Sequence, residues 1–221
     1  MFITKLKVIS SPTEIATAIT DILLALVAGG AVIYLQCSES NEIWKVNTWS
    51  WAFALIALSG FLGAIAHGLE LIETHHRRIW HLINLSLGLS VSIFVIGVAY
   101  DLWGFASARK MLPWMIGCAL LFFLVTRLFS GIFFVFIIYE AAALLFAFTA
   151  YGWLAITDQL NGAIPMAVGV LVSIIAAGIQ ASKKVNIKII FEFDHNGIFH
   201  IVQLVGIIIL TVGIRLSLPP G

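Results

Sequence analysis

Two histidines lie where the last apolar segment of the chain begins, and they could bind a metal ion or transfer a proton. His195 and His200 belong to the stretch 194–203, which also carries one carboxylate and two amides. Neutral imidazoles suit a tetrahedral zinc site, and three protein ligands with one open position suit catalysis. Asp194 could act as an acid/base group, or it could simply be the N-cap of a helix that starts here.

A second group of polar residues surrounds an earlier hairpin. His67 and Glu70 end the second apolar segment, and His81 and Asn84 begin the third. Each pair is spaced i to i+3, so its two side chains lie on neighbouring positions of one helical face. His67 and His200 adjoin long apolar runs in which water is scarce, which favours a ligand role over a solvated one. His81 could be a ligand, an acid/base group or an interfacial side chain.

These residues define a predicted site. The predicted metal ligands are His67, His195 and His200. The predicted catalytic residues are Ser59, Glu70, His81 and Asp194.

Further polar residues within apolar segments predict a cavity that leads from this site toward the middle of the membrane. They are Glu14, Asp21, Asn84, Glu140 and Gln203. A carboxylate near mid-bilayer costs several kcal/mol unless it faces a partner or a wet cavity. Asp21 shares one helical face with Glu14 and three threonines, so this face is expected to turn inward. Asp21 and Glu140 could lie on a proton path, or they could be protonated structural groups.

The composition of the chain defines its class. Of 221 residues, 61% are hydrophobic and 10% are charged, and the mean hydropathy is +1.07. Soluble domains have roughly 45–50% apolar and about 25% charged residues. The sequence therefore predicts an integral, multi-pass membrane protein with one domain, its partner being the bilayer. A net charge of +1 without a basic patch argues against a nucleic-acid partner.

The apolar segments predict an all-α bundle of seven transmembrane helices. The expected spans are 13–36, 49–70, 79–100, 113–127, 132–156, 163–181 and 197–216. With seven spans, eight Lys and Arg residues fall on the side of the N-terminus and four on the other. This bias predicts a cytoplasmic N-terminus and an outside C-terminus.

Local signals predict where several elements begin and end. Ser11, Pro12 and Glu14 predict an N-cap, a first-turn proline and a capping box for the first span. Residues 37–48 and 101–110 are expected to be loops, with Pro113 opening the fourth span. The fourth and fifth spans are expected to meet in a tight turn at 127–131, and 185–193 to be an extended interfacial segment.

Seven spans, a serine and a histidine in the second and a histidine pair opening the seventh resemble the CREST superfamily, which includes alkaline ceramidases and the progestin and adiponectin receptors. The resemblance covers the whole chain. It implies a zinc ion held by a Ser-x-x-x-His element and a His-x-x-x-His element. Here the spacings are Ser59-x7-His67 and His195-x4-His200, with Gly63 and Asn196 at the family's positions. The family's aspartate of the third span has no counterpart, and His81 or Asn84 occupies that region.

Three functions are consistent with these residues. The resemblance implies a zinc-dependent hydrolase that cleaves a lipid amide or ester near the cytoplasmic face. The mid-membrane carboxylates Asp21 and Glu140 instead fit a proton or metal-ion transporter. A haem-binding electron-transfer protein with axial histidines is a third possibility.

Overall fold

The protein is built from long helices. Its computed structural model describes residues 7–129, 133–188 and 192–219. The helices are α1 (Pro12–Gln36), α2 (Ile43–Gly68), α3 (Glu73–Leu128), α4 (Phe133–Ile156), α5 (Ala163–Ser182) and α6 (His195–Leu216). A short antiparallel hairpin pairs β1 (Ile187–Lys188) with β2 (Glu192–Phe193), within the segment expected to be extended. All six of these helices, within the described residues, are long and apolar enough to cross a membrane.

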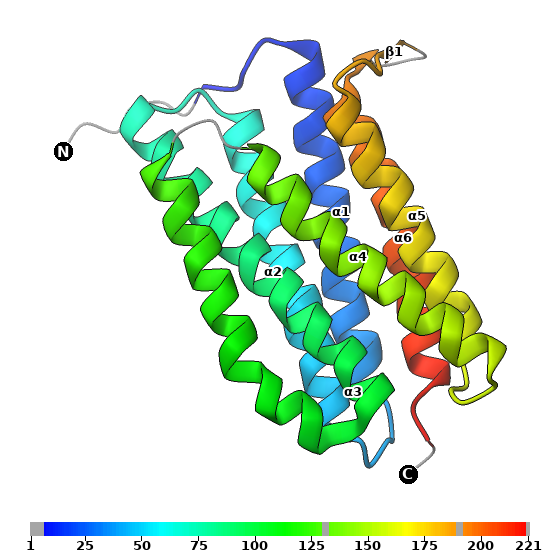
Figure 1. Cartoon of the computed structure of the whole chain (residues 1–221). Coiled ribbons are helices and arrows are strands. Elements are labelled where there is room, and N and C mark those ends of the chain that lie inside the picture. Colours follow the sequence, from blue (N-terminus) through cyan, green and yellow to red (C-terminus); the bar gives the residue numbers. More distant parts are fainter. Residues whose placement is uncertain (1–6, 130–132, 189–191, 220–221) are drawn as a thin grey trace.

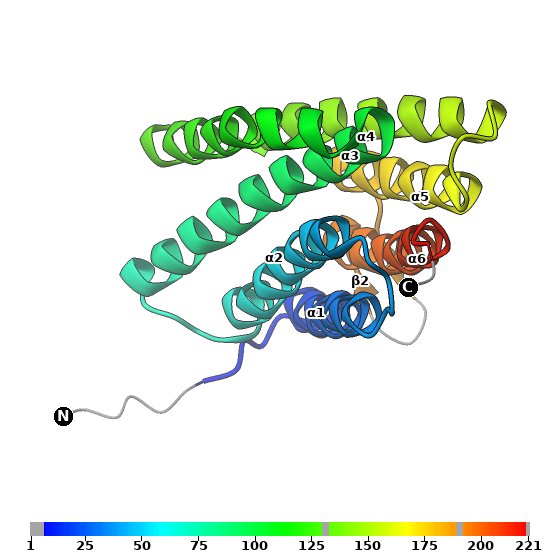
Figure 2. The same cartoon turned by 90° about the horizontal axis from the view of Figure 1, so that it is seen from below.

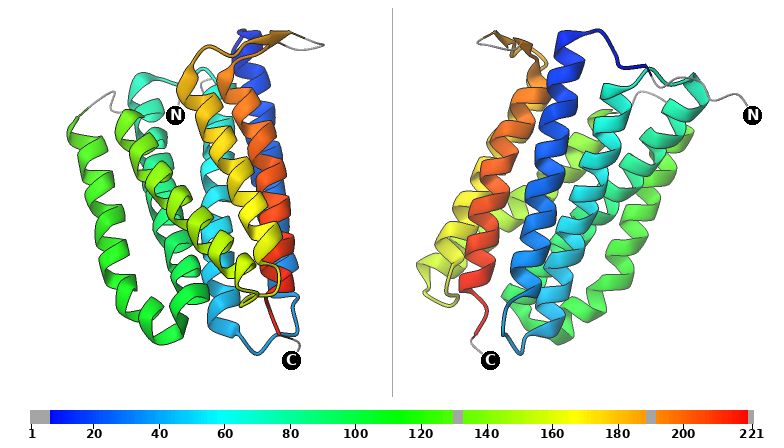
Figure 3. Two further views of the ribbon diagram at one scale, coloured as in Figure 1. Left: turned by 45° about the vertical axis from the view of Figure 1, so that its right-hand side comes forward. Right: turned by 180° about the vertical axis from the view of Figure 1, so that it is seen from behind.

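Helix α3 reverses its direction part of the way along. A straight helix of its 56 residues would be about 84 Å long, far more than the roughly 30 Å of a bilayer core. At Gly104 the backbone has φ 77° and ψ 177°, a conformation that glycine adopts without steric cost. There the helix doubles back on itself (Figures 1 and 3). The predicted loop at 101–110 is therefore wrong, as is a span opening at Pro113, because helix continues on both sides of Gly104 and Pro113 lies inside it.

The starts of two helices differ from prediction, and α3 is one of them, since it begins at Glu73 and not at residue 79. Helix α2 begins at Ile43, within the predicted loop 37–48, because the charge of Lys45 is paired with Asp101 and can be buried in the first turn. Helix α1 has Ser11 as its N-cap and Pro12 in its first turn, as predicted, but the capping box does not form. The Ser11 hydroxyl lies 3.0 Å from the Thr13 hydroxyl, and Glu14 turns toward α2.

The start of α6 confirms the capping role predicted for Asp194. Its Oδ1 accepts hydrogen bonds from the backbone amides of Asn196 and Gly197, each at 3.0 Å. The helix consequently begins at His195, so both histidines of the predicted pair lie on it. The predicted turn at 127–131 is only partly visible: α3 ends at Leu128, and 130–132 lie outside the described residues.

The helices form a closed ring. Each packs against its neighbours in the sequence, and α6 packs against α1 to complete the circuit. Figure 2 shows α1, α2 and α6 on one side and the α3 and α4 helices on the other, with α5 between α4 and α6. The buried apolar core contains Leu35, Trp49, Tyr151, Met166 and Ile214.

The two ends of this ring carry different polar residues. We call the end that holds the first turns of α1, α3 and α6 and the last turn of α2 the histidine end (Figure 1). The opposite end, where α2 begins and α6 ends, is the lysine end, after Lys45. At the histidine end, the segment before α1 pairs with the residues after α2 through a bridge between Val8 and Leu69.

Candidate functional site

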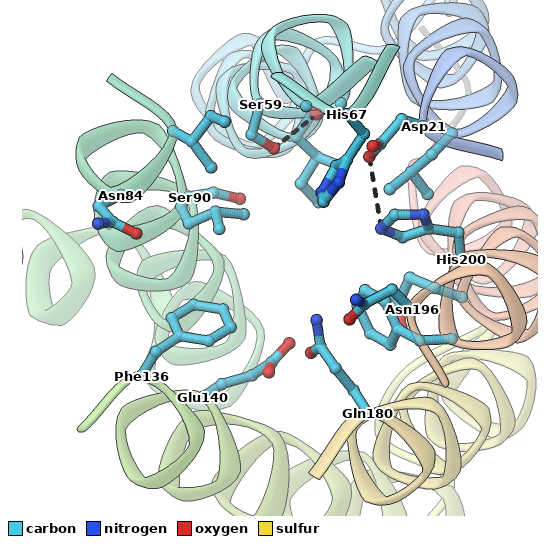
Figure 4. A pocket seen from close by; sticks show the side chains of 18 of the residues that line it. Asp21, Ser59, His67, Asn84, Ser90, Phe136, Glu140, Gln180, Asn196 and His200 are labelled. Atoms are coloured by element: carbon cyan, nitrogen blue, oxygen red, sulfur yellow. Dashed lines mark hydrogen bonds and ion pairs between the residues drawn. The ribbon is translucent and has the colours of Figure 1, made fainter. Parts of the chain in front are cut away.

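A cavity of about 430 Å³ opens inside the ring toward the histidine end. Figure 4 shows polar side chains from several helices pointing into it. Eight residues of the predicted site line the cavity, which places the predicted chemistry in one compartment: Asp21, Ser59, His67, Asn84, Glu140, His195, His200 and Gln203. The wall also has an apolar part, formed in particular by Leu24, Ile56, Leu87 and Val91.

His200 is buried, and a threonine of α1 fixes the orientation of its ring. The Thr20 hydroxyl donates its proton to the backbone carbonyl of Thr17 at 2.9 Å. The same hydroxyl lies 3.1 Å from Nδ1 of His200, so it must accept a proton there. Nδ1 therefore carries the proton, and Nε2 keeps a free lone pair.

His67 is oriented in a similar way by a carboxylate. Its Nδ1 lies 2.7 Å from Oε2 of Glu14, which leaves Nε2 unprotonated when the ring is neutral. The His67 ring also packs against Trp80 in a T-shaped arrangement, with the ring centroids 5.5 Å apart. In Figure 4 the rings of His67 and His200 lie on the same side of the cavity, near the carboxylate of Asp21.

Asp21 is the buried carboxylate of this cluster. Its Oδ1 lies 3.4 Å from Nε2 of His200, and its Oδ2 has no hydrogen-bond partner among the described residues. A Cβ atom at Gly63 would lie 2.8 Å from both carboxylate oxygens, so the glycine leaves the space that Asp21 occupies. The inward face predicted for Asp21 and the threonines of α1 is confirmed, since Thr17, Thr20 and Asp21 are all buried.

Glu140 enters the cavity from α4, opposite the histidines (Figure 4). It has no hydrogen-bond or ion-pair partner among the described residues. Gln203 lies deeper, on α6, and donates from Nε2 to the Ser173 hydroxyl at 3.2 Å. Ser59 also lines the cavity, but its hydroxyl donates to the carbonyl of Ile56 at 2.9 Å.

Four residues of the predicted site do not line the cavity. Glu14 lies behind His67 and orients it. Glu70 is exposed and pairs with Lys7, with 2.8 Å between Oε1 and Nζ. Asp194 is occupied by its cap and by the Thr17 hydroxyl at 3.3 Å. His81 is the fourth, and its neighbours Trp80 and Asn84 line the wall in its place.

Sequence reasoning missed Thr20 as the partner of His200, although it placed a threonine face next to Asp21. It also missed Gln180 and Asn196, which both line the cavity. Gln180 lies on α5, in the expected span 163–181, for which no site residue was predicted. A single amide near the end of an otherwise apolar span was the signal that could have identified it.

The donor atoms partly fit a metal ion. Two ligands at about 2.0–2.1 Å from a tetrahedral zinc ion lie roughly 3.3 Å apart. The 3.4 Å between His200 Nε2 and Asp21 Oδ1 matches this separation. No set of three His, Cys, Asp or Glu side chains within the described ranges is close enough to surround an ion as it stands. The fit therefore extends to the pair, with His67 as the adjacent imidazole.

The fold and cavity define a class: an all-helical protein with membrane-length helices around an internal polar site. The chain belongs to a family of unknown function (DUF6962), whose model matches residues 16–219. No curated protein matches the sequence. No solved structure matches it either.

Proposed function

We propose that the protein is an intramembrane hydrolase that binds a zinc ion and cleaves an amide or ester bond of a membrane lipid. In this proposal His67 and His200 bind the metal through Nε2, and Asp21 supplies the third ligand in place of His195. His195 would remain at the wall of the cavity as a polar contact for the substrate. The resemblance to the CREST superfamily supports the same reaction class.

One observation carries the proposal: two imidazoles on the cavity have Nδ1 occupied and Nε2 free, and Nε2 of His200 lies 3.4 Å from the buried carboxylate of Asp21. Nδ1 of His67 pairs with Glu14, and Nδ1 of His200 pairs with Thr20. Metal-binding histidines characteristically use one ring nitrogen for the metal and the other for such a partner, which fixes the tautomer and the ring plane. Oδ2 of Asp21 has no hydrogen-bond partner among the residues that the structure describes, so it can bind a metal ion without breaking an existing hydrogen bond.

A bound zinc ion would supply a water of lowered pKa and polarise the carbonyl under attack. The chain's own residues would provide a group that transfers protons and a surface that binds the substrate. Glu140 lies across the cavity from His200 and Asp21, where its carboxylate could accept a proton from the attacking water or return one to the leaving group. The apolar wall of Leu24, Ile56 and Val91 suits an acyl chain.

The membrane arrangement that supports this function has seven crossings. Helix α3 would supply two of them, joined at Gly104. The histidine end then faces the cytoplasm, because the eight positive residues predicted for that side outnumber the four on the other. A lipid entering between helices would reach the cavity with its acyl chain still in the bilayer.

Metal analysis of the detergent-solubilised protein tests the proposal. We expect about one zinc ion per chain in the parent protein. Both His200→Ala and Asp21→Asn should lose the metal while the protein keeps its helical circular dichroism. His75→Ala is the matched control, because His75 is an exposed histidine at the start of α3 that does not line the cavity.

An activity assay then separates metal binding from hydrolysis. The parent protein should release fatty acid from a fluorogenic lipid amide or ester, and the two variants should lose this activity together with the metal. A folded parent protein that takes up no zinc would overturn the proposal. So would zinc that is retained by both His200→Ala and Asp21→Asn.

A further inference from the structure

A second, smaller cavity of about 70 Å³ adjoins the first on the side of the lysine end. Five residues line both cavities, so the two compartments share a wall: Ile56, Ser90, Val91, Glu140 and Gln203. The hydrolytic site needs none of this space.

Two residues that line the second cavity each carry a buried polar atom without a hydrogen-bond partner among the described residues. These atoms are Nε1 of Trp49 and Oε1 of Gln203. Buried polar groups without a protein partner are the usual partners of internal water. One water needs only about 10–15 Å³ of such volume, so the cavity has room for at least two. Hydration of this cavity would satisfy both atoms.

Glu140 connects the two cavities. It is the one carboxylate on the described part of α4's membrane-length segment, and it lines both spaces without a protein partner among the described residues. An unpaired carboxylate at membrane depth is costly and typically marks a pathway for ions or protons. The Ser90 hydroxyl donates to the carbonyl of Ala52, so its proton is not available to the Glu140 carboxylate.

Beyond Trp49, the polar groups continue to the lysine end. Lys45 lies one helical turn before Trp49 on α2, and its Nζ is 2.5 Å from Oδ1 of Asp101. The Tyr151 hydroxyl donates to the other oxygen of Asp101 at 3.0 Å. The side chains of Lys45 and Asp101 are 3% and 1% exposed, so this ion pair is buried between Trp49 and the lysine end.

We propose that Glu140 and a hydrated second cavity form a proton path, gated by Trp49 and the Lys45–Asp101 pair, through which the protein conducts protons across the bilayer. This function goes beyond hydrolysis and does not depend on a bound metal. The Glu140 carboxylate would accept a proton from water in the first cavity and release it to water in the second. Each proton carried moves one positive charge, which must be balanced by another ion.

The test uses purified full-length protein in liposomes that contain a pH-sensitive dye. A potassium gradient with valinomycin provides the driving force and the balancing ion. We expect internal acidification several-fold faster than in protein-free liposomes. Glu140→Gln should reduce the rate to that of protein-free liposomes, and Gln203→Leu should lower it by removing an anchor for water. Glu39→Gln, which alters an exposed carboxylate in the loop after α1, should leave the rate unchanged.

The possible outcomes separate this proposal from the hydrolase. Acidification no faster than in protein-free liposomes would overturn it, even if the protein binds zinc and cleaves lipids. Equal flux in the parent and in Glu140→Gln would overturn it as well. Flux that survives His200→Ala but not Glu140→Gln would support the proton path whatever the metal analysis shows.

Discussion

Two buried pairs of a carboxylate and a basic side chain lie toward the two ends of the ring, and they differ in how fully their hydrogen-bonding capacity is used. Toward the histidine end, His200 Nε2 and Asp21 Oδ1 are 3.4 Å apart beside a cavity, and Asp21 Oδ2 has no partner in the described part of the chain. Toward the lysine end, Lys45 Nζ and Asp101 Oδ1 are 2.5 Å apart, and the Tyr151 hydroxyl donates a hydrogen bond to Oδ2 of Asp101.

The difference separates a structural role from a binding role. The lysine-end pair links α2, α3 and α4, and Lys45 also reaches the carbonyl of Ser217 after α6 at 3.5 Å. Its groups already have partners, so a ligand would have to displace one of them. The histidine-end pair retains a free lone pair and a free oxygen beside open space. Mutations at the lysine-end pair should therefore affect stability, and mutations at the histidine-end pair should affect ligand binding.

The largest expected effect is the loss of stability in Lys45→Ala. Removing one partner leaves the Asp101 carboxylate buried without its counter-charge, which costs about 3–5 kcal/mol. Thermal unfolding in detergent, followed by circular dichroism, measures the loss. The double variant Lys45→Met with Asp101→Leu should recover much of it, because neither charge then remains buried. A single variant as stable as the parent would contradict a structural role for this pair.

Gly63→Ala should have an intermediate effect that involves both stability and binding. The new methyl group would lie 2.8 Å from both oxygens of Asp21, so the carboxylate must move. Overpacking of this kind typically costs about 1–3 kcal/mol, and here it also displaces a proposed zinc ligand. We expect a lower melting temperature together with reduced zinc content. Gly29→Ala is the control, because a Cβ atom there has no neighbour within 4 Å. Zinc content equal to that of the parent would argue against Asp21 as a ligand.

Thr20→Val should weaken binding with a smaller effect on the fold. The substitution keeps the shape of the side chain but removes the hydroxyl that accepts a proton from His200 Nδ1. Loss of such an orienting partner commonly lowers metal affinity by about 10–100-fold. Competition with a chromophoric chelator would measure the change, and Thr20→Ser should restore most of the affinity. If Thr20→Val and Thr20→Ser bind zinc with equal affinity, the hydroxyl at position 20 does not orient the His200 ring.

The sequence predicted the fold at the level of apolar segments, since their lengths and polar interruptions are local properties. It located the reversal of α3 within 101–110, where Gly104 lies, but it took the whole stretch for a loop, whereas helix continues on both sides of Gly104. The same limit applies to the site. His67 and His200 could be identified as polar groups beside apolar runs. Their partners Glu14 and Thr20 depend on how α1 packs between α2 and α6, which no spacing reveals.

The burial of Lys45 with Asp101 was unpredictable for a related reason. Lys45 lies in a stretch that reads as a polar loop, and Asp101 lies in another. Each residue alone is expected in solvent. They become buried because α2 starts at Ile43 and α3 continues through Asp101, which brings the two charges together.

The smallest expected effect is that of Glu70→Gln. This variant breaks an exposed ion pair at the histidine end, which contrasts with the two buried pairs compared above. The sequence assigned Glu70 an acid/base role, but its carboxylate pairs with Lys7, and these side chains are 42% and 74% exposed. Exposed pairs of this kind contribute about 0–1 kcal/mol. We therefore expect a melting temperature within a few degrees of the parent, unchanged zinc content and unchanged lipid hydrolysis. A loss of hydrolysis with the metal retained would instead show that Glu70 reaches the substrate, and the residues outside the cavity would then have to be included in the site.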